Sequence, residues 1–177
     1  MAWDWADVVA DPEPPFQRIA RYYDAIYTAK GRDPSAEIAL LFPAWSNDGL
    51  DPSTRRILDA GCGTGVHLDF LGRHGIVEGL DRSPDMLAFA RKRHPGARLH
   101  EGDFRYFRLA NRFNVICCLF GGIGYLPDRP ALGAAIGRLG DHVAPGGVLL
   151  LEPPLVAEAF QTPQVQHLET VLDGRRL

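Results

Sequence analysis

The sequence has few cysteines, no long apolar run and no excess of positive charge. Its three cysteines, Cys62, Cys117 and Cys118, are an odd number and lack the spacing of a zinc site, so we interpret them as buried thiols. No segment approaches the roughly 20 apolar residues that span a bilayer. The first ten residues contain two aspartates and no basic region before an apolar stretch. We therefore expect a soluble, cytoplasmic protein without a metal site and without a membrane partner.

The charge balance argues against nucleic acid as the main ligand. Nineteen Lys and Arg residues stand against 22 Asp and Glu residues, which gives a formal net charge of -3. Such a chain lacks the positive field that attracts phosphate backbones. With 177 residues, 46% hydrophobic and 23% charged, the composition is typical of one globular domain.

Short apolar runs alternate with helical stretches from residue 55 onward, which is typical of parallel strands joined by crossover helices. The strands are predicted at Arg55–Ala60, Ile76–Leu80, Arg98–His100, Asn114–Leu119 and Gly147–Glu152. Helices are predicted at Phe16–Lys30, from Asp33 or Pro34 to about Trp45, from Ser83 to about Arg93, and from Pro130 to Val143. The fold class is therefore α/β, with a mostly parallel sheet of about five strands behind N-terminal helices.

A glycine-rich turn joins the first of these strands to a helix. The segment Ile57–Leu68 contains Asp-x-Gly-x-Gly-x-Gly, in which Gly61 and Gly63 allow a ligand to approach the backbone closely. Asp59, just before the glycines, can hold the loop or meet a cationic amino-acid group. A glycine loop by itself is also compatible with a tight turn that binds nothing, so the residues at the neighbouring strand ends are needed to interpret it.

Two further acids follow the second and third strands. Asp81 stands twenty positions after Gly61, where a carboxylate can accept hydrogen bonds from both ribose hydroxyls of a nucleoside. Asp103 can accept from an adenine amino group while Phe104 packs on the ring. Either acid can instead cap a local turn. The three acids together favour a nucleoside-containing ligand.

In this combination the sequence resembles the class I S-adenosylmethionine-dependent methyltransferase family, over about residues 16–155. The resemblance implies a Rossmann-like three-layer sandwich, S-adenosylmethionine as cofactor, and a ribose contact for Asp81. It implies that Ala60, Gly61 and Gly63 meet the methionine part, that Asp103 and Phe104 meet the adenine, and that Met86, Leu119 and Phe120 line the adenine and methyl regions. It divides the chain into an N-terminal helical cap (1–53), a cofactor-binding core (54–155) and the start of the substrate-side strands (156–177).

Within that family, local motifs are similar to aminosugar N,N-dimethyltransferases that act on nucleotide-linked sugars. The motifs are Tyr22–Tyr27, Lys30–Asp33, Leu99–Asp103, Phe120–Leu126 and Glu152-Pro153. The resemblance implies that the N-terminal helices close over the cofactor with Tyr23 beside it. The chain departs from the pattern at Pro34, at Pro154-Leu155, and at Tyr125, where some members have histidine. These departures lie on the substrate side.

The implied reaction is N-methylation of a small-molecule amine or a nucleotide-linked sugar. A nitrogen nucleophile must arrive without its proton, and desolvation favours the neutral amine. Tyr125 is the candidate catalytic residue, either orienting the acceptor or taking its proton. Arg105, Arg108 and Arg112 are interpreted as a solvated face, with a grip on a diphosphate as the alternative.

Two other functions share parts of this pattern. An NAD(P)-dependent oxidoreductase also uses a glycine turn and an acid, but its Gly-x-Gly-x-x-Gly spacing requires glycine where Val66 stands. A cofactor-binding protein without turnover is the second alternative.

The C-terminal residues indicate an incomplete sheet. Gln164–Leu172 alternates like one strand, and Asp173-Gly174 is typical of a hairpin turn before a return strand from Arg175. We expect truncated C-terminal strands, and either a longer natural protein or an open sheet edge covered by another chain, such as a homodimer partner.

Overall fold

The structure is a computed structural model that describes residues 15–152, 171–172 and 175–176. Its main sheet has five parallel strands in the order β3-β2-β1-β4-β5. The strands are β1 (Arg56–Ala60), β2 (Ile76–Asp81), β3 (Arg98–Glu101), β4 (Phe113–Cys118) and β5 (Val143–Leu151). The chain builds outward from β1 to β3 and then returns to β4 on the other side of β1. Parallel sheets of this kind bind ligands at such a reversal, beyond the carboxyl ends of the strands.

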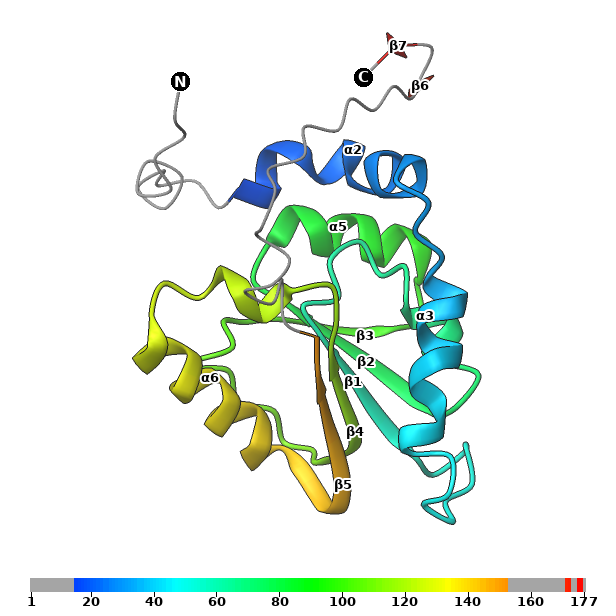
Figure 1. The fold of residues 1–177 in the computed structure, drawn as a ribbon, viewed down its shortest axis with the longest axis vertical. Coiled ribbons are helices and arrows are strands. Elements are labelled where there is room, and N and C mark those ends of the chain that lie inside the picture. The colour runs from blue at the N-terminus through cyan, green and yellow to red at the C-terminus, as the bar shows by residue number, and fades with distance from the viewer. Residues whose placement is uncertain (1–14, 153–170, 173–174, 177) are drawn as a thin grey trace, which may run out of the picture.

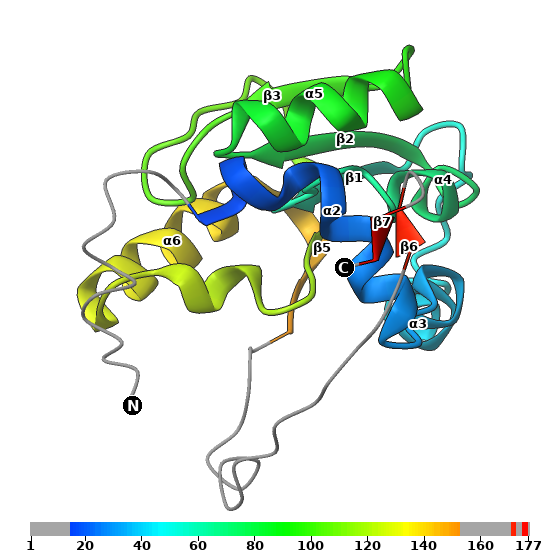
Figure 2. The same ribbon diagram turned by 90° about the horizontal axis from the view of Figure 1, so that it is seen from above.

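Helices cover both faces of the sheet and form three layers, so the predicted fold is confirmed (Figure 1). One face carries α3 (Pro34–Leu41), α4 (Leu68–Leu71) and α5 (Pro84–Arg93), and the other carries α6 (Arg129–Asp141). A further helix, α2 (Pro15–Ala29), lies beside α5 and above the strand ends (Figures 1 and 2).

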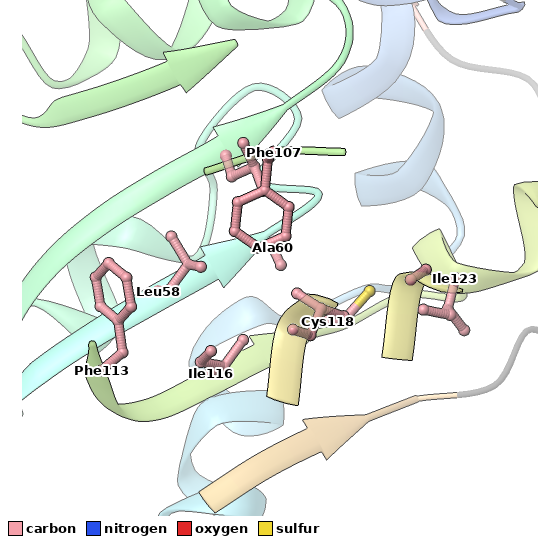
Figure 3. Packing of buried hydrophobic residues seen from close by; sticks show 10 residues of the cluster. Leu58, Ala60, Phe107, Phe113, Ile116, Cys118 and Ile123 are labelled. Atoms are coloured by element: carbon pink, nitrogen blue, oxygen red, sulfur yellow. The ribbon is translucent and has the colours of Figure 1, made fainter. Parts of the chain in front are cut away.

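The core lies on both sides of the central strands. Leu58 and Ile116, from β1 and β4, pack with Phe113 on the α6 face (Figure 3). Ile57 and Val115 point to the opposite face and pack with α3 and α4. Because both faces are buried, these strands are continuous apolar runs rather than alternating ones.

The helix starts follow the capping residues. The Ser83 hydroxyl accepts a hydrogen bond from the Met86 amide at 3.3 Å, and Asp33 caps α3 by accepting from the Ser35 and Ala36 amides. Both caps were predicted. α6 begins one residue before the predicted Pro130 and is capped by Asp128.

Two of the predicted boundaries are wrong. β5 begins at Val143, so residues 145–147 lie inside the strand, where the register with β4 shifts and Gly146 has φ +74°. The helix predicted to reach Trp45 ends at Leu41 and continues as a 3₁₀ turn, η1 (Phe42–Ala44), because Pro43 has no amide to donate. After the glycine loop the helix is only the single turn α4.

A short antiparallel pair, β6 (Val171–Leu172) with β7 (Arg175–Arg176), confirms the predicted return strand. The rest of the strand predicted from Gln164 lies outside the described residues, as does the turn at 173–174. None of the helices in the described ranges combines the length and apolar character that a membrane crossing requires.

Candidate functional site

The glycine loop continues β1 directly above the sheet. Gly61, Gly63 and Gly65 have φ values of +80°, +54° and +81°, which side chains rarely adopt. The loop is held by the Gly61 and Cys62 amides, which donate to the Leu80 carbonyl at 2.7 and 3.0 Å. A Cβ on Gly61 would lie 3.1 Å from the Phe104 ring, whereas a Cβ on Gly63 would meet no protein atom within 4 Å. The backbone at Gly63 is therefore open to a ligand.

Asp81 at the end of β2 anchors this loop. Its carboxylate accepts from the Gly63 amide and from the Ser83 amide, each at 2.8 Å. Burial raises its pKa, and the backbone hydrogen bonds oppose that shift. Asp81 therefore caps the local turn before α5, which was the alternative to a ribose contact. A carboxylate has about four acceptor sites, so these amide bonds leave capacity for ribose hydroxyls.

Asp59, one strand away, is 1% exposed, and its Oδ2 has no hydrogen-bond partner in the structure. Burial raises its pKa to about 6, with His67 lowering it and Asp81 raising it further. An unpaired buried carboxylate oxygen costs free energy unless a donor reaches it. This oxygen, near the end of the strand that leads into the glycine loop and without a partner among the described residues, fits the ammonium group of an amino-acid ligand.

Asp103 follows β3 and is paired within its own turn. Its carboxylate accepts from the Arg105 backbone and guanidinium at 2.8–2.9 Å, and this pairing lowers its pKa. The Gly102 amide donates to the Asp81 carbonyl at 2.9 Å and so ties the two strand ends together. The structure thus brings the three predicted acids to adjacent strand ends.

The predicted apolar contacts divide into core and partly buried residues. Met86 is 2% exposed and Leu119 is 5% exposed, so both pack in the core, and their place beside a cofactor stays a prediction. Phe104 is partly buried, packs on the α6-side cluster and lies next to Gly61. Ala60 is fully buried at the end of β1.

An aromatic cluster joins α2 to the end of β4. The Tyr27 ring lies 4.6 Å from Tyr23 and 4.4 Å from Phe120, the latter pair edge to face. The Arg32 guanidinium lies 3.1 Å from the Phe120 ring centre. Phe120 has φ +57°, a strained value for an aromatic residue, and its amide donates to Glu152 at 2.6 Å. Strain of this kind persists where surrounding contacts hold it, often at functional sites.

Tyr23 also interacts electrostatically with one of the acids, Asp81. Burial raises its pKa, and the nearby Tyr27, Tyr125 and Asp81 raise it further. Tyr23 therefore lies in the field of Asp81, on the side of the glycine loop that α2 covers.

A polar clamp that the sequence did not reveal fastens α2 to the loop. Asp24 accepts from the Thr64 hydroxyl and from Arg93, each at 2.5 Å, and Arg93 also donates to the Thr64 carbonyl at 2.9 Å. A second tie runs through Glu37, which accepts from Arg32 and pairs with His67 at 2.8 Å. Asp24 stands in the Tyr-Asp motif, but its partners lie too far along the chain for spacing to suggest them.

Tyr125 lies in the 3₁₀ turn η2 (Gly122–Tyr125) after β4 and is 47% exposed. Burial of its other half and the nearby Tyr27 raise its pKa. At neutral pH the phenol is therefore protonated, which favours orienting an acceptor over removing its proton. Among the described residues no cluster of His, Cys, Asp and Glu could hold a metal ion.

Comparisons with known proteins agree with this geometry. A family described as "Methyltransferase domain" matches residues 57–147. A Streptomyces fradiae dTDP-3-amino-3,6-dideoxy-alpha-D-glucopyranose N,N-dimethyltransferase is 42% identical over 88% of this chain and 60% of its own length. A Streptomyces venezuelae dTDP-3-amino-3,4,6-trideoxy-alpha-D-glucopyranose N,N-dimethyltransferase is 39% identical over 88% and 65%. The chain thus spans about 60 to 65% of the length of these relatives.

Solved structures agree as well. SAM-bound CalS10, an amino pentose methyltransferase from Micromonospora echinaspora, matches with a TM-score of 0.78 and 39% identity over 87% of this chain and 65% of that one. Streptomyces venezuelae DesVI matches with a TM-score of 0.77 and 35% identity over 99% and 68%. The fold, the glycine loop and these relatives agree, and the chain belongs to the class I S-adenosylmethionine-dependent methyltransferase family.

Proposed function

We propose that this chain binds S-adenosylmethionine and acts as an N-methyltransferase on the amino group of a nucleotide-linked amino sugar. The observation that carries the cofactor assignment is the row of acids at the ends of β1, β2 and β3, with the Asp59 Oδ2 unpartnered below the glycine loop. The acceptor assignment rests on the dTDP-linked amino sugars named for three relatives.

Each group of the cofactor has a candidate partner among these residues. Asp59 would pair with the methionine ammonium, Gly61 and Gly63 would admit the methionine part, Asp81 would accept from the ribose, and Asp103 from the adenine amino group. The aromatic cluster with Tyr23 and Phe120 would close the site from above. When bound, S-adenosylmethionine would supply a methyl group attached to a cationic sulfur. The nucleophile would attack the methyl carbon, and the sulfur would be the leaving group.

The acceptor side needs orientation and exclusion of water more than strong acid-base groups. Tyr125 would hydrogen-bond the acceptor and hold the neutral amine in line with the methyl group. The faces of Tyr23 and Tyr27 would stabilise the cationic product at about 0.5 to 2 kcal/mol each.

We further propose the division into a helical cap (1–53), a core (54–155) and the start of the substrate-side strands (156–177), and a cytoplasmic location. β5 is an edge of the described five-stranded sheet, and an exposed edge can pair with another strand. A homodimer through that edge is part of the proposal.

The oxidoreductase alternative is not favoured, because the relatives are methyltransferases and Val66 departs from the dinucleotide spacing.

The test combines calorimetry with a transfer assay on the protein as it exists. We expect binding of S-adenosylmethionine, no binding of NAD(P), and release of S-adenosylhomocysteine with a dTDP-linked amino sugar, with mass spectrometry detecting two successive methyl additions. The matched control is the same nucleotide sugar with hydroxyl in place of the amino group, which should not react. Cofactor binding without release for any amine would overturn the catalytic proposal in favour of a binding protein, and NAD(P) binding alone would overturn both parts.

A further inference from the structure

Arg105 grips the carboxylate of Asp103 from two residues along the chain. The backbone amide of Arg105 donates to Oδ1 at 2.9 Å, its Nε donates to the same oxygen at 2.8 Å, and its Nη2 donates to Oδ2 at 2.8 Å. The guanidinium thus makes the two-pronged contact that fixes a carboxylate in one plane.

These bonds limit what Asp103 can offer a ligand. An ionised carboxylate has about four acceptor sites and no donor. Arg105 occupies three of them, two on Oδ1 and one on Oδ2. A ligand therefore meets an acceptor-only group whose remaining capacity lies on Oδ2.

The backbone around Asp103 is held equally firmly. The amides of Tyr106 and Phe107 both donate to the Asp103 carbonyl, at 3.0 and 2.9 Å, and the Phe107 side chain is buried in the core. Phe104 packs against the same core next to Gly61. The carboxylate is thus fixed on a rigid turn beside the glycine loop.

The same pairing argues against a role for Arg105 in holding a diphosphate. The Nε and Nη2 groups of its guanidinium face Asp103, and the guanidinium lies 4.9 Å from the centre of the Tyr106 ring. A guanidinium has five N–H donors, so a phosphate could contact only those that Asp103 leaves, on Nη1 and the second Nη2 hydrogen, unless this ion pair breaks. The structure favours a role toward the cofactor.

We propose that Arg105 is a positioning residue for cofactor specificity, which holds Asp103 as a fixed acceptor so that the site selects the amino group of adenine over the carbonyl group of a 6-oxopurine. This inference rests on the proposed function, because it takes the cofactor to be an adenine nucleoside. An adenine amino group donates to the remaining site on Asp103, whereas a carbonyl oxygen at the same place would face a carboxylate oxygen without a proton between them.

The experiment measures dissociation constants of S-adenosylhomocysteine and S-inosylhomocysteine by calorimetry. The variants are Arg105→Ala, Arg105→Lys and, as matched control, Arg108→Ala, an exposed arginine on the same segment. The unsubstituted protein should bind the adenine compound about 10- to 100-fold more tightly than the inosine compound, the range expected for one charge-assisted hydrogen bond. Arg105→Ala should lose most of that ratio through weaker binding of the adenine compound alone.

Arg105→Lys keeps the charge without the two-pronged geometry and should recover part of the ratio, and Arg108→Ala should leave it unchanged. If Arg105→Ala does not fold, Arg105→Lys carries the test. Equal weakening of both compounds would overturn the inference in favour of a merely structural role. An unchanged ratio with a raised KM for the nucleotide sugar would overturn it in favour of the diphosphate grip. In either case binding of S-adenosylhomocysteine by the unsubstituted protein leaves the proposed function standing, whereas no binding of either compound overturns the proposed function itself.

Discussion

The ends of β1, β2 and β3 differ in construction from the end of β4. At the ends of β2 and β3 the carboxylates are fixed by hydrogen bonds, because Asp81 accepts from the Gly63 amide and Asp103 accepts from Arg105. Beyond β4, Phe120 sits in a left-handed conformation held by α2 and Glu152, and Tyr125 is half exposed. These two carboxylates are therefore held in place before a ligand arrives, whereas the acceptor side depends on the packing of Tyr23 and Tyr27 on Phe120.

A similar contrast separates two acids on neighbouring strands. Asp81 accepts two backbone hydrogen bonds, while the Asp59 Oδ2 has no partner although Asp59 is more deeply buried. The first acid shapes the loop, whereas at the second the burial of an unpaired carboxylate oxygen costs free energy. Four predictions test these differences, beginning with the largest expected effect.

Replacing Asp81 should cause the largest loss of cofactor affinity. We expect Asp81→Ala to weaken binding of S-adenosylhomocysteine by about 2 to 4 kcal/mol, because charge-assisted hydrogen bonds to the ribose and the support of Gly63 are lost together. Calorimetry on the folded variant measures the change. Asp85→Ala, an exposed acid in the first turn of α5, is the control and should bind normally. An unchanged dissociation constant for Asp81→Ala would exclude the ribose role.

Replacing Asp59 should change how stability depends on pH. Its pKa is about 6 in the folded protein against an ordinary 3.8, so between these values the folded state binds more protons than the unfolded state. Stability from this group is complete below about pH 4 and is lost as the pH rises through about 6, by roughly 3 kcal/mol in total. Urea unfolding across this range should show that loss relative to Asp59→Asn. If the free energy of unfolding depends on pH in the same way in the unsubstituted protein and in Asp59→Asn, the raised pKa of Asp59 is contradicted.

Gly61→Ala should lower the free energy of unfolding, with a smaller effect than those expected for Asp81 and Asp59. The φ of +80° costs a residue with a side chain about 1 to 2 kcal/mol, and the added Cβ would also press on the Phe104 ring at 3.1 Å. Gly96→Ala is the matched control, since no atom lies within 4 Å of a Cβ there. The free energy of unfolding in urea should separate the two variants, and equal stabilities would count against the strain at Gly61.

Tyr125→Phe should have the smallest effect, and this effect should be on kcat and not on cofactor affinity. Loss of one orienting hydrogen bond, worth about 0.5 to 1.5 kcal/mol, should lower kcat by about 10-fold or less and leave binding of S-adenosylhomocysteine unchanged. Tyr106→Phe, an exposed tyrosine near Asp103, is the control for loss of a phenol. A fall in cofactor affinity for Tyr125→Phe, without a fall in kcat, would remove the contrast between the two sides.

Sequence reasoning recovered most of the sheet but less of the site. The strand ends at Ala60 and near Asp81 and Glu101 follow from short apolar runs and the acids that end them, signals that lie within a few residues. The start of β5 was misplaced because Pro145-Gly146 is typical of a turn, and only pairing with β4 shows that it is a bulge inside a strand. Arg105 was interpreted as part of a solvated face, but it pairs with Asp103, because a basic side chain shows its partner only in three dimensions.

The sequence by itself determined the α/β alternation, the helix caps at Asp33 and Ser83, and the glycine positions of the loop. These features depend on periodicity and on hydrogen bonds between neighbouring residues, which residue types specify locally. Tertiary structure alone decided the clamp of Asp24 on Thr64 and Arg93, which are 40 and 69 residues away, and the unpaired state of the Asp59 Oδ2. Such pairings depend on how helices pack across strand ends, and burial then sets the charge state of the groups that packing encloses.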